Sequence, residues 1–146
     1  MATIEVSTVI NRSIEEVFAV LSNEENRPKW SSTTIEVKKT SEGPIGAGTT
    51  WRGVDRIFGR RMERESVFTE YEPNRKVIQK STSGRVPFQV QLMYESVEGG
   101  TRVIVIAEAQ PRGLFKLAGP LLMRLRKRQF ATDLANVKAM IEADAF

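Results

Sequence analysis

The chemistry open to this 146-residue chain is limited by two absences, because it contains no histidine and no cysteine. Zinc sites built from these residues, Ser-His-Asp and Cys-His nucleophile systems, and disulfides are therefore excluded. Acid–base chemistry would fall to Asp, Glu, Lys, Arg or Tyr. The carboxylates are not clustered as a hard-cation loop requires, so we expect no metal and no other cofactor.

Tyr94 is the strongest candidate for orienting a ligand. It ends an alternating row formed by Phe88, Val90 and Leu92, which predicts a strand with one apolar face. A tyrosine at the end of such a row carries a hydroxyl that needs a hydrogen-bond partner. We therefore expect the Tyr94 hydroxyl to be the polar group that orients a bound ligand.

Charged side chains on two neighbouring predicted strands have two interpretations. Arg52 and Arg56 flank one strand, while Glu63 and Glu65 share a face of the next. They could supply an acid and a base to a site. We favour a solvated outer face with cross-strand ion pairs, because exposed charges on strands commonly pair in this way.

Four cations lie close together in the run from Arg124 to Arg128. Such a run could contact phosphates or an anionic membrane surface. No aromatic residues alternate with it and no nucleic-acid motif surrounds it, so we expect no nucleic-acid partner. A solvated helix face is the favoured interpretation, and membrane contact is the less favoured one.

The N-terminal elements follow from two periodicities. The first ten residues alternate as a half-buried strand does. Ser13 and Glu16 form a capping box ahead of apolar residues at helical spacing, which predicts a short amphipathic helix. Asn23 to Ser32 contains Pro28 and predicts a second short helix or turn, with Trp30 closing one end of the core.

Turn signals divide the central region into six predicted strands with short connections. Short connections require antiparallel pairing, so the six strands predict a meander. The strand that contains Val103 to Ile106 is apolar on both sides, and its inward face is left open. The predicted strands are Thr34 to Lys39, Thr49 to Val54, Arg61 to Tyr71, Lys76 to Ser81, Phe88 to Glu95 and Arg102 to Glu108.

A helical period from Leu114 to Ile141 predicts one long C-terminal helix. Gly119-Pro120 should kink or break its first third, because proline lacks a backbone donor. The alternative is that Pro120 merely begins the helix proper. We also expect the Gly-rich loop from Ser41 to Gly48 and the Gly119-Pro120 segment to open together and admit a ligand.

This order of elements is the α+β helix-grip arrangement. The motifs I-N-R-S-I-E-E-V-F-A-V-L-S-N, G-A-G-T-T-W, V-F-T-E-Y-E-P-N-R and V-E-G-G-T-R-V occur in order along the chain. With them the chain resembles the polyketide cyclase/dehydrase branch of the START-like (SRPBCC) superfamily. The resemblance spans nearly the whole chain and implies a single helix-grip domain over residues 1–146.

The resemblance also implies binding of a hydrophobic small molecule, a lipid, polyketide-like compound or aromatic metabolite, in a cavity between the curved sheet and the C-terminal helix. The second hypothesis is a cyclase or dehydratase that uses Tyr94 with an inward Arg or Glu. The simpler alternative is that the same apolar residues only pack as core. The predicted cavity residues are Trp51, Phe88, Val90, Leu92, Tyr94, Leu122, Phe130, Leu134 and Val137.

We expect a cytoplasmic location, because no apolar run is long enough to span a bilayer and the first residues lack the pattern of a signal peptide. Hydrophobic residues make up 40% and charged residues 27% of the chain. This composition is typical of a globular domain with one core. The formal net charge of +4 is small enough to serve solubility alone.

Overall fold

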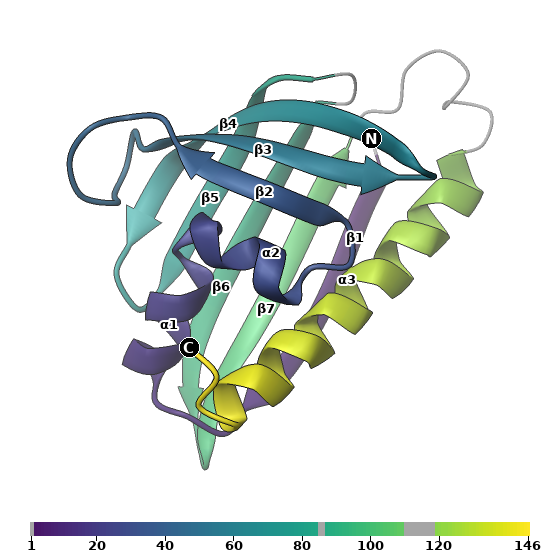
Figure 1. Ribbon diagram of the computed structural model, residues 1–146. Helices are drawn as coiled ribbons and strands as arrows, with labels where there is room; N and C mark the ends of the chain where they lie inside the picture. Colours follow the sequence, from purple (N-terminus) through teal and green to yellow (C-terminus); the bar gives the residue numbers. More distant parts are fainter. Residues whose placement is uncertain (1, 85–86, 110–118) are drawn as a thin grey trace.

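The computed structural model describes residues 2–84, 87–109 and 119–146, and it confirms the α+β helix-grip arrangement (Figure 1). Seven antiparallel strands form one sheet, which short helical segments and a long C-terminal helix cover on one face. The elements are β1 (Ala2–Ile10), α1 (Ile14–Leu21), η1 (Glu24–Asn26), α2 (Arg27–Trp30), β2 (Thr34–Lys39), β3 (Thr50–Ile57), β4 (Arg60–Glu72), β5 (Lys76–Ser83), β6 (Phe88–Val97), β7 (Gly100–Ala109) and α3 (Gly119–Glu142).

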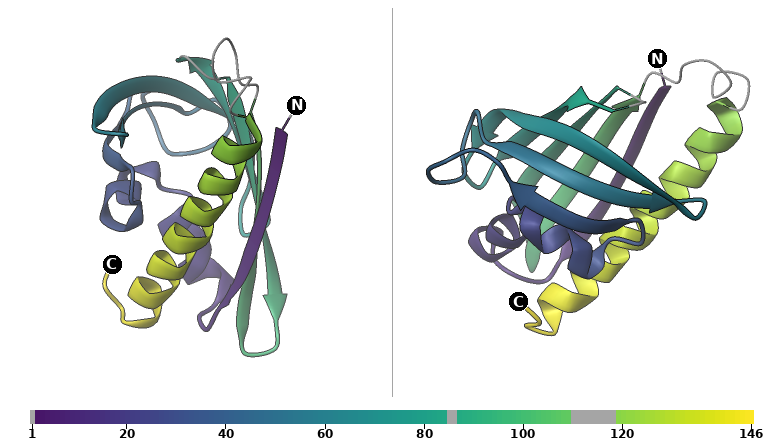
Figure 2. Two further views of the ribbon diagram at one scale, coloured as in Figure 1. Left: turned by 90° about the vertical axis from the view of Figure 1, so that its right-hand side faces the viewer. Right: turned by 45° about the horizontal axis from the view of Figure 1, so that its top comes forward.

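The sheet has the order β1-β7-β6-β5-β4-β3-β2, so the predicted six-strand meander is confirmed and β1 pairs with its last strand. β2, β3 and β4 curl over the face that carries the helices, which makes the sheet strongly curved (Figure 2). A curved sheet of this kind surrounds its inner face on more than one side. The core therefore lies between the curl, α1, α2 and α3.

The predicted start of the first helix is confirmed by its cap. Ser13 is extended and its Oγ accepts a hydrogen bond from the backbone N–H of Glu16 at 3.3 Å. This bond satisfies one of the free donors at the N-terminus of α1. Val17, Phe18 and Leu21 then turn toward the core, and Trp30 is buried at the end of α2.

The inward face of β7 is now defined. Val103, Val105 and Ala107 are buried in the core, while Ile104 and Ile106 are only partly covered. β6 shows the expected alternation, with Val90, Leu92 and Tyr94 facing inward. The two central strands thus present one continuous apolar inner surface.

The described part of α3 starts at Gly119, with Pro120 as its second residue. The predicted helical residues Leu114 to Ala118 lie outside the described residues. α3 contacts β1 and α2 and buries Asp133, Leu134, Val137 and Ile141. None of the described helices has an apolar stretch long enough to cross a bilayer.

The predicted opening between Gly119-Pro120 and the Ser41 to Gly48 loop is not supported by the arrangement of the elements. The loop connects β2 to β3 on one side of the molecule, while the start of α3 lies on the other side (Figures 1 and 2). The glycine and proline residues in these two segments did not indicate whether the segments lie close together in the fold. These two segments do not frame one opening.

Candidate functional site

The nine predicted cavity residues are buried to different degrees. Six of them are less than a tenth exposed and belong to one core cluster: Trp51, Val90, Leu92, Tyr94, Leu134 and Val137. Phe88 and Phe130 are half-buried and pack against this cluster, whereas Leu122 is half-buried outside it. Their contact with a ligand stays a prediction.

A chain of aromatic rings runs through the same interior. The ring of Phe18 lies 4.9 Å from Tyr94 and 5.4 Å from Tyr71, centroid to centroid. Phe68 continues the chain, 6.2 Å from Tyr71 and 5.3 Å from Trp51. α1, β3, β4 and β6 thus contribute to a single aromatic cluster, of which the sequence analysis singled out only Trp51 and Tyr94.

Three ring-borne polar atoms are buried in this interior without a hydrogen-bond partner among the described residues. They are Nε1 of Trp30, Nε1 of Trp51 and the hydroxyl of Tyr94. The fourth such atom, Oε2 of Glu72, lies 3.8 Å from Nζ of Lys76 and so has a charged neighbour. Buried polar groups are nearly always paired, so three orphaned ring groups in one core are unusual.

The Tyr94 hydroxyl is held in its neutral form by its surroundings. Burial raises the pKa of Tyr94 well above its usual range, and the nearby negative charge of Glu24 raises it further. A neutral phenol in a dry site acts as a hydrogen-bond donor and not as a base. The buried Tyr94 hydroxyl is thus a hydrogen-bond donor without an acceptor among the described residues.

The interior also contains a polar region beside α2. Glu24 is buried, and its carboxylate receives two hydrogen bonds from Arg27, at 2.5 Å from Nε and 3.0 Å from Nη2. The Arg27 guanidinium stacks over the ring of Trp30 at 5.0 Å. Burial alone would lower the pKa of Arg27, but its pairing with Glu24 outweighs burial and raises it.

A second ion pair, which is largely buried, joins β3 to β4. Arg64 donates from Nε to Oδ2 of Asp55 at 2.7 Å, and Thr34 Oγ1 donates to Oδ1 of the same carboxylate at 2.8 Å. Gly53 lies opposite Arg64 in the sheet, and a Cβ atom there would lie 2.6 Å from the guanidinium carbon. The glycine thus leaves room for Arg64 to reach Asp55.

α3 completes the polar region. The Asp133 carboxylate accepts hydrogen bonds from the backbone N–H of Ser32 at 2.9 Å and from Oγ of Ser31 at 3.5 Å. Gln129 donates from Nε2 to Thr33 Oγ1 at 2.7 Å and accepts a bond of the same length from Arg126. Arg126 also stacks over Phe130 at 5.3 Å.

Most of this polar region escaped the sequence analysis, although a signal was present. Arg64 alternates with Ser66 and Phe68, so period 2 places all three on the inward face of β4. Arg126 is four residues before Phe130 and eight before Leu134, so it lies on their face of α3. The interpretation of Arg124 to Arg128 as a wholly solvated face was therefore wrong at Arg126, which is half-buried, and right for the exposed side chains of Arg124, Lys127 and Arg128.

The interpretation of the charged strand residues as an outer face is confirmed. Arg52, Arg56, Glu63 and Glu65 are all exposed, and Arg52 pairs with Glu63 across β3 and β4 at 2.5 Å. Their exposure removes them from any interior chemistry. Among the described residues, no group of three or more Asp and Glu side chains could hold a metal ion.

The largely buried Asp55 should make the free energy of unfolding fall in acid. Burial would raise the pKa of Asp55, but hydrogen bonds from Arg64 and Thr34 and the Arg64 charge lower it below its ordinary value. A depressed carboxyl pKa stabilises the fold above the unfolded pKa, and this gain is lost as the pH falls below about 4. We expect the stability difference between wild type and Asp55→Asn, measured by urea unfolding, to narrow below that pH. A difference that stays constant down to pH 3 would contradict this prediction.

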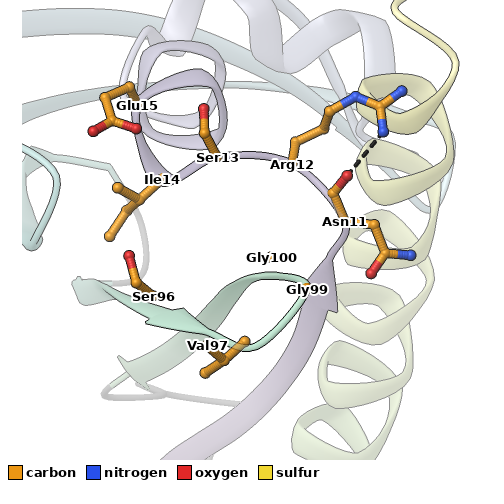
Figure 3. Close-up of a pocket in the computed structure, with 9 residues that line it drawn as sticks. All are labelled: Asn11, Arg12, Ser13, Ile14, Glu15, Ser96, Val97, Gly99 and Gly100. Atoms are coloured by element: carbon orange, nitrogen blue, oxygen red, sulfur yellow. Dashed lines mark hydrogen bonds between the residues drawn. The ribbon is translucent and has the colours of Figure 1, made fainter.

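The described residues outline two surface hollows, and neither is lined by a predicted cavity residue. The larger, of about 420 Å³, lies between the β1–α1 connection and the β6–β7 hairpin (Figure 3). Asn11 to Glu15 line one side and Ser96, Val97, Gly99 and Gly100 the other. The smaller, of about 200 Å³, lies between α1 and the end of α3.

Comparison with solved structures shows that the fold recurs at low sequence identity. A protein of Thermus thermophilus is 15% identical with a TM-score of 0.82, over 99% of this chain and 100% of its own. The Zhui aromatase/cyclase of Streptomyces sp. R1128 is 14% identical with a TM-score of 0.81, over 99% and 96%. A START superfamily protein of Mycobacterium smegmatis is 12% identical with a TM-score of 0.81, over 97% of each chain.

No curated protein shows significant sequence similarity to this chain. At the identities found, the solved structures establish the fold alone. The sequence family described as polyketide cyclase / dehydrase and lipid transport matches residues 1–142, which is nearly the full length. The chain therefore belongs to this family, and it shares the helix-grip fold of the START superfamily protein.

Proposed function

We propose that the protein binds a hydrophobic small molecule in its interior, between the curved sheet and α3, with the nine predicted residues as the lining. The family includes lipid transport in its description, and the Zhui neighbour is an aromatase/cyclase. Both point to apolar ligands of the lipid or polyketide kind. The aromatic cluster of this chain offers such a ligand a matching apolar surface.

The orphaned donors at Trp30, Trp51 and Tyr94 carry the proposal. Each buried group without a partner costs about 1–3 kcal/mol. A ligand with carbonyl or other acceptor oxygens would supply the missing partners and recover that cost on binding. The ligand that fits is therefore apolar in its body and carries hydrogen-bond acceptors.

Binding is favoured over catalysis by the state of the interior acid–base groups. Glu24 and Asp55 are each engaged by an arginine, and the Tyr94 hydroxyl stays protonated. A general base needs a free proton acceptor within reach of its substrate. The described interior offers donors for a ligand. Its third buried carboxylate, Asp133, already accepts hydrogen bonds from Ser31 and Ser32.

The test is fluorescence titration with phenylnaphthylamine, a neutral apolar dye that brightens in dry surroundings. Wild type should bind it at one saturable site. Leu134→Trp adds a large ring to the interior and should weaken binding by about tenfold or more, since the added volume removes the space for a ligand. Leu121→Trp places the same ring at an exposed position of the same helix and should leave binding unchanged.

The fold of each variant is checked by circular dichroism and urea unfolding. Leu92→Trp, which fills the interior from β6, serves as a second variant if Leu134→Trp does not fold. Unchanged dye affinity in a folded interior variant would show that the dye site is elsewhere. Failure of wild type to bind the dye would refute the proposed function.

A further inference from the structure

Arg126 differs from the other two arginines of the interior polar region. Arg27 and Arg64 each make two hydrogen bonds to a carboxylate. All 18 Asp and Glu residues fall within the described ranges, and none lies within 4.0 Å of the Arg126 guanidinium. The amide oxygen of Gln129 is the side-chain acceptor that Arg126 reaches.

The surroundings of Arg126 do not neutralise it. Burial lowers the pKa of Arg126. The positive charges of Arg27 and Arg64 also lower it, and they act against the negative charges of Asp55 and Asp133, which raise it. Asp133 is held by Ser31 and Ser32 and does not reach the guanidinium. A half-buried cation without a carboxylate is costly unless a counter-charge reaches it.

Arg126 lies close enough to the apolar interior to act on the same ligand. It stacks on Phe130, which packs against the core cluster. Arg27 stacks on Trp30, and Trp30 and Tyr94 both belong to this same core cluster. The unpaired ring donors of Trp30, Trp51 and Tyr94 and the Arg126 guanidinium are all hydrogen-bond donors, so each needs an acceptor atom. A guanidinium binds oxyanions through its planar set of N–H groups.

We infer that the ligand carries an anionic group, a carboxylate or an equivalent oxyanion, and that Arg126 on α3 pairs with this group while the apolar body lies against the aromatic cluster. This inference rests on the proposed function and specifies its ligand class. Arg126 contributes specificity, since a neutral ligand of the same shape gains nothing from it. Its partial exposure places the anion at the edge of the interior, where desolvation costs least.

The test uses two dyes that share one apolar body, phenylnaphthylamine and anilinonaphthalenesulfonate, which adds a sulfonate. Arg126→Gln should weaken binding of the sulfonate dye by about tenfold or more, as expected for loss of a charge-assisted hydrogen bond. Its affinity for phenylnaphthylamine should change less than about twofold, because the apolar contacts remain. Arg128→Gln removes the same charge from an exposed position and should affect neither dye.

The outcomes separate the inference from the proposed function. If Arg126→Gln and Arg128→Gln weaken binding of the sulfonate dye equally, the effect comes from the overall charge of the protein and the inference is overturned. Unchanged sulfonate binding in Arg126→Gln would also overturn it, while phenylnaphthylamine binding in the same samples would leave the proposed function standing. Absence of phenylnaphthylamine binding to wild type would refute the proposed function and the inference with it.

Discussion

Asp55→Ala is expected to lower the free energy of unfolding by about 3–5 kcal/mol, the usual cost of removing one partner of a buried ion pair. The side chains of Asp55 and Arg64 are only 15% and 16% exposed, so solvent does little to replace the lost carboxylate. Thr34 loses its acceptor in the same variant. Arg64 would then be a buried cation with no counter-charge in contact.

Urea unfolding followed by circular dichroism measures this loss. Glu63→Ala is the matched control, because it breaks the ion pair with Arg52 on the outer face of the same two strands. That pair is about half exposed, and its loss should cost less than about 1 kcal/mol. The double variant Asp55→Ala/Arg64→Leu should recover most of the loss, since no uncompensated charge remains. A cost for Asp55→Ala no greater than that for Glu63→Ala would contradict this account.

The sequence predicted the fold well where local rules determine it. The Ser13 cap and the alternation of Val90, Leu92 and Tyr94 each follow from a short segment, and each is confirmed. Strand ends were less certain: β3 continues to Ile57, three residues beyond the predicted end at Val54. Asp55 was consequently read as part of a connection, although it shares the inward face of Trp51.

The site was harder to predict because it depends on contacts between distant elements. Glu24 and Arg27 read as ordinary polar residues of a turn, and the packing of η1 and α2 against β2 and α3 encloses them. The direction of the β7 side chains was likewise undetermined until β1 and β6 were placed on either side. Period and composition identify which faces are apolar, but tertiary packing decides which polar groups are enclosed.

Tyr94→Phe is expected to raise the free energy of unfolding of the ligand-free protein by about 1–2 kcal/mol, which is opposite to the usual effect of a core substitution. The variant keeps the ring that packs on Phe18 and removes a hydroxyl that has no hydrogen-bond partner in the described structure. The penalty for burying that hydroxyl is thereby removed. The same variant should bind an acceptor-bearing ligand more weakly, because the donor that would meet the ligand is gone.

Both halves of this prediction are measurable on one preparation. Urea unfolding gives the stability, and titration with a naphthyl ketone dye, whose carbonyl accepts hydrogen bonds, gives an affinity that should fall by about three- to tenfold. Tyr71→Phe is the control, because this second tyrosine shares the aromatic cluster and its hydroxyl is not an orphaned buried group. A loss of stability in Tyr94→Phe would show that the hydroxyl is already satisfied within the protein. Greater stability with unchanged ketone binding would place the ligand away from Tyr94, whereas greater stability with weaker binding would show that the protein keeps an unpaired donor for its ligand.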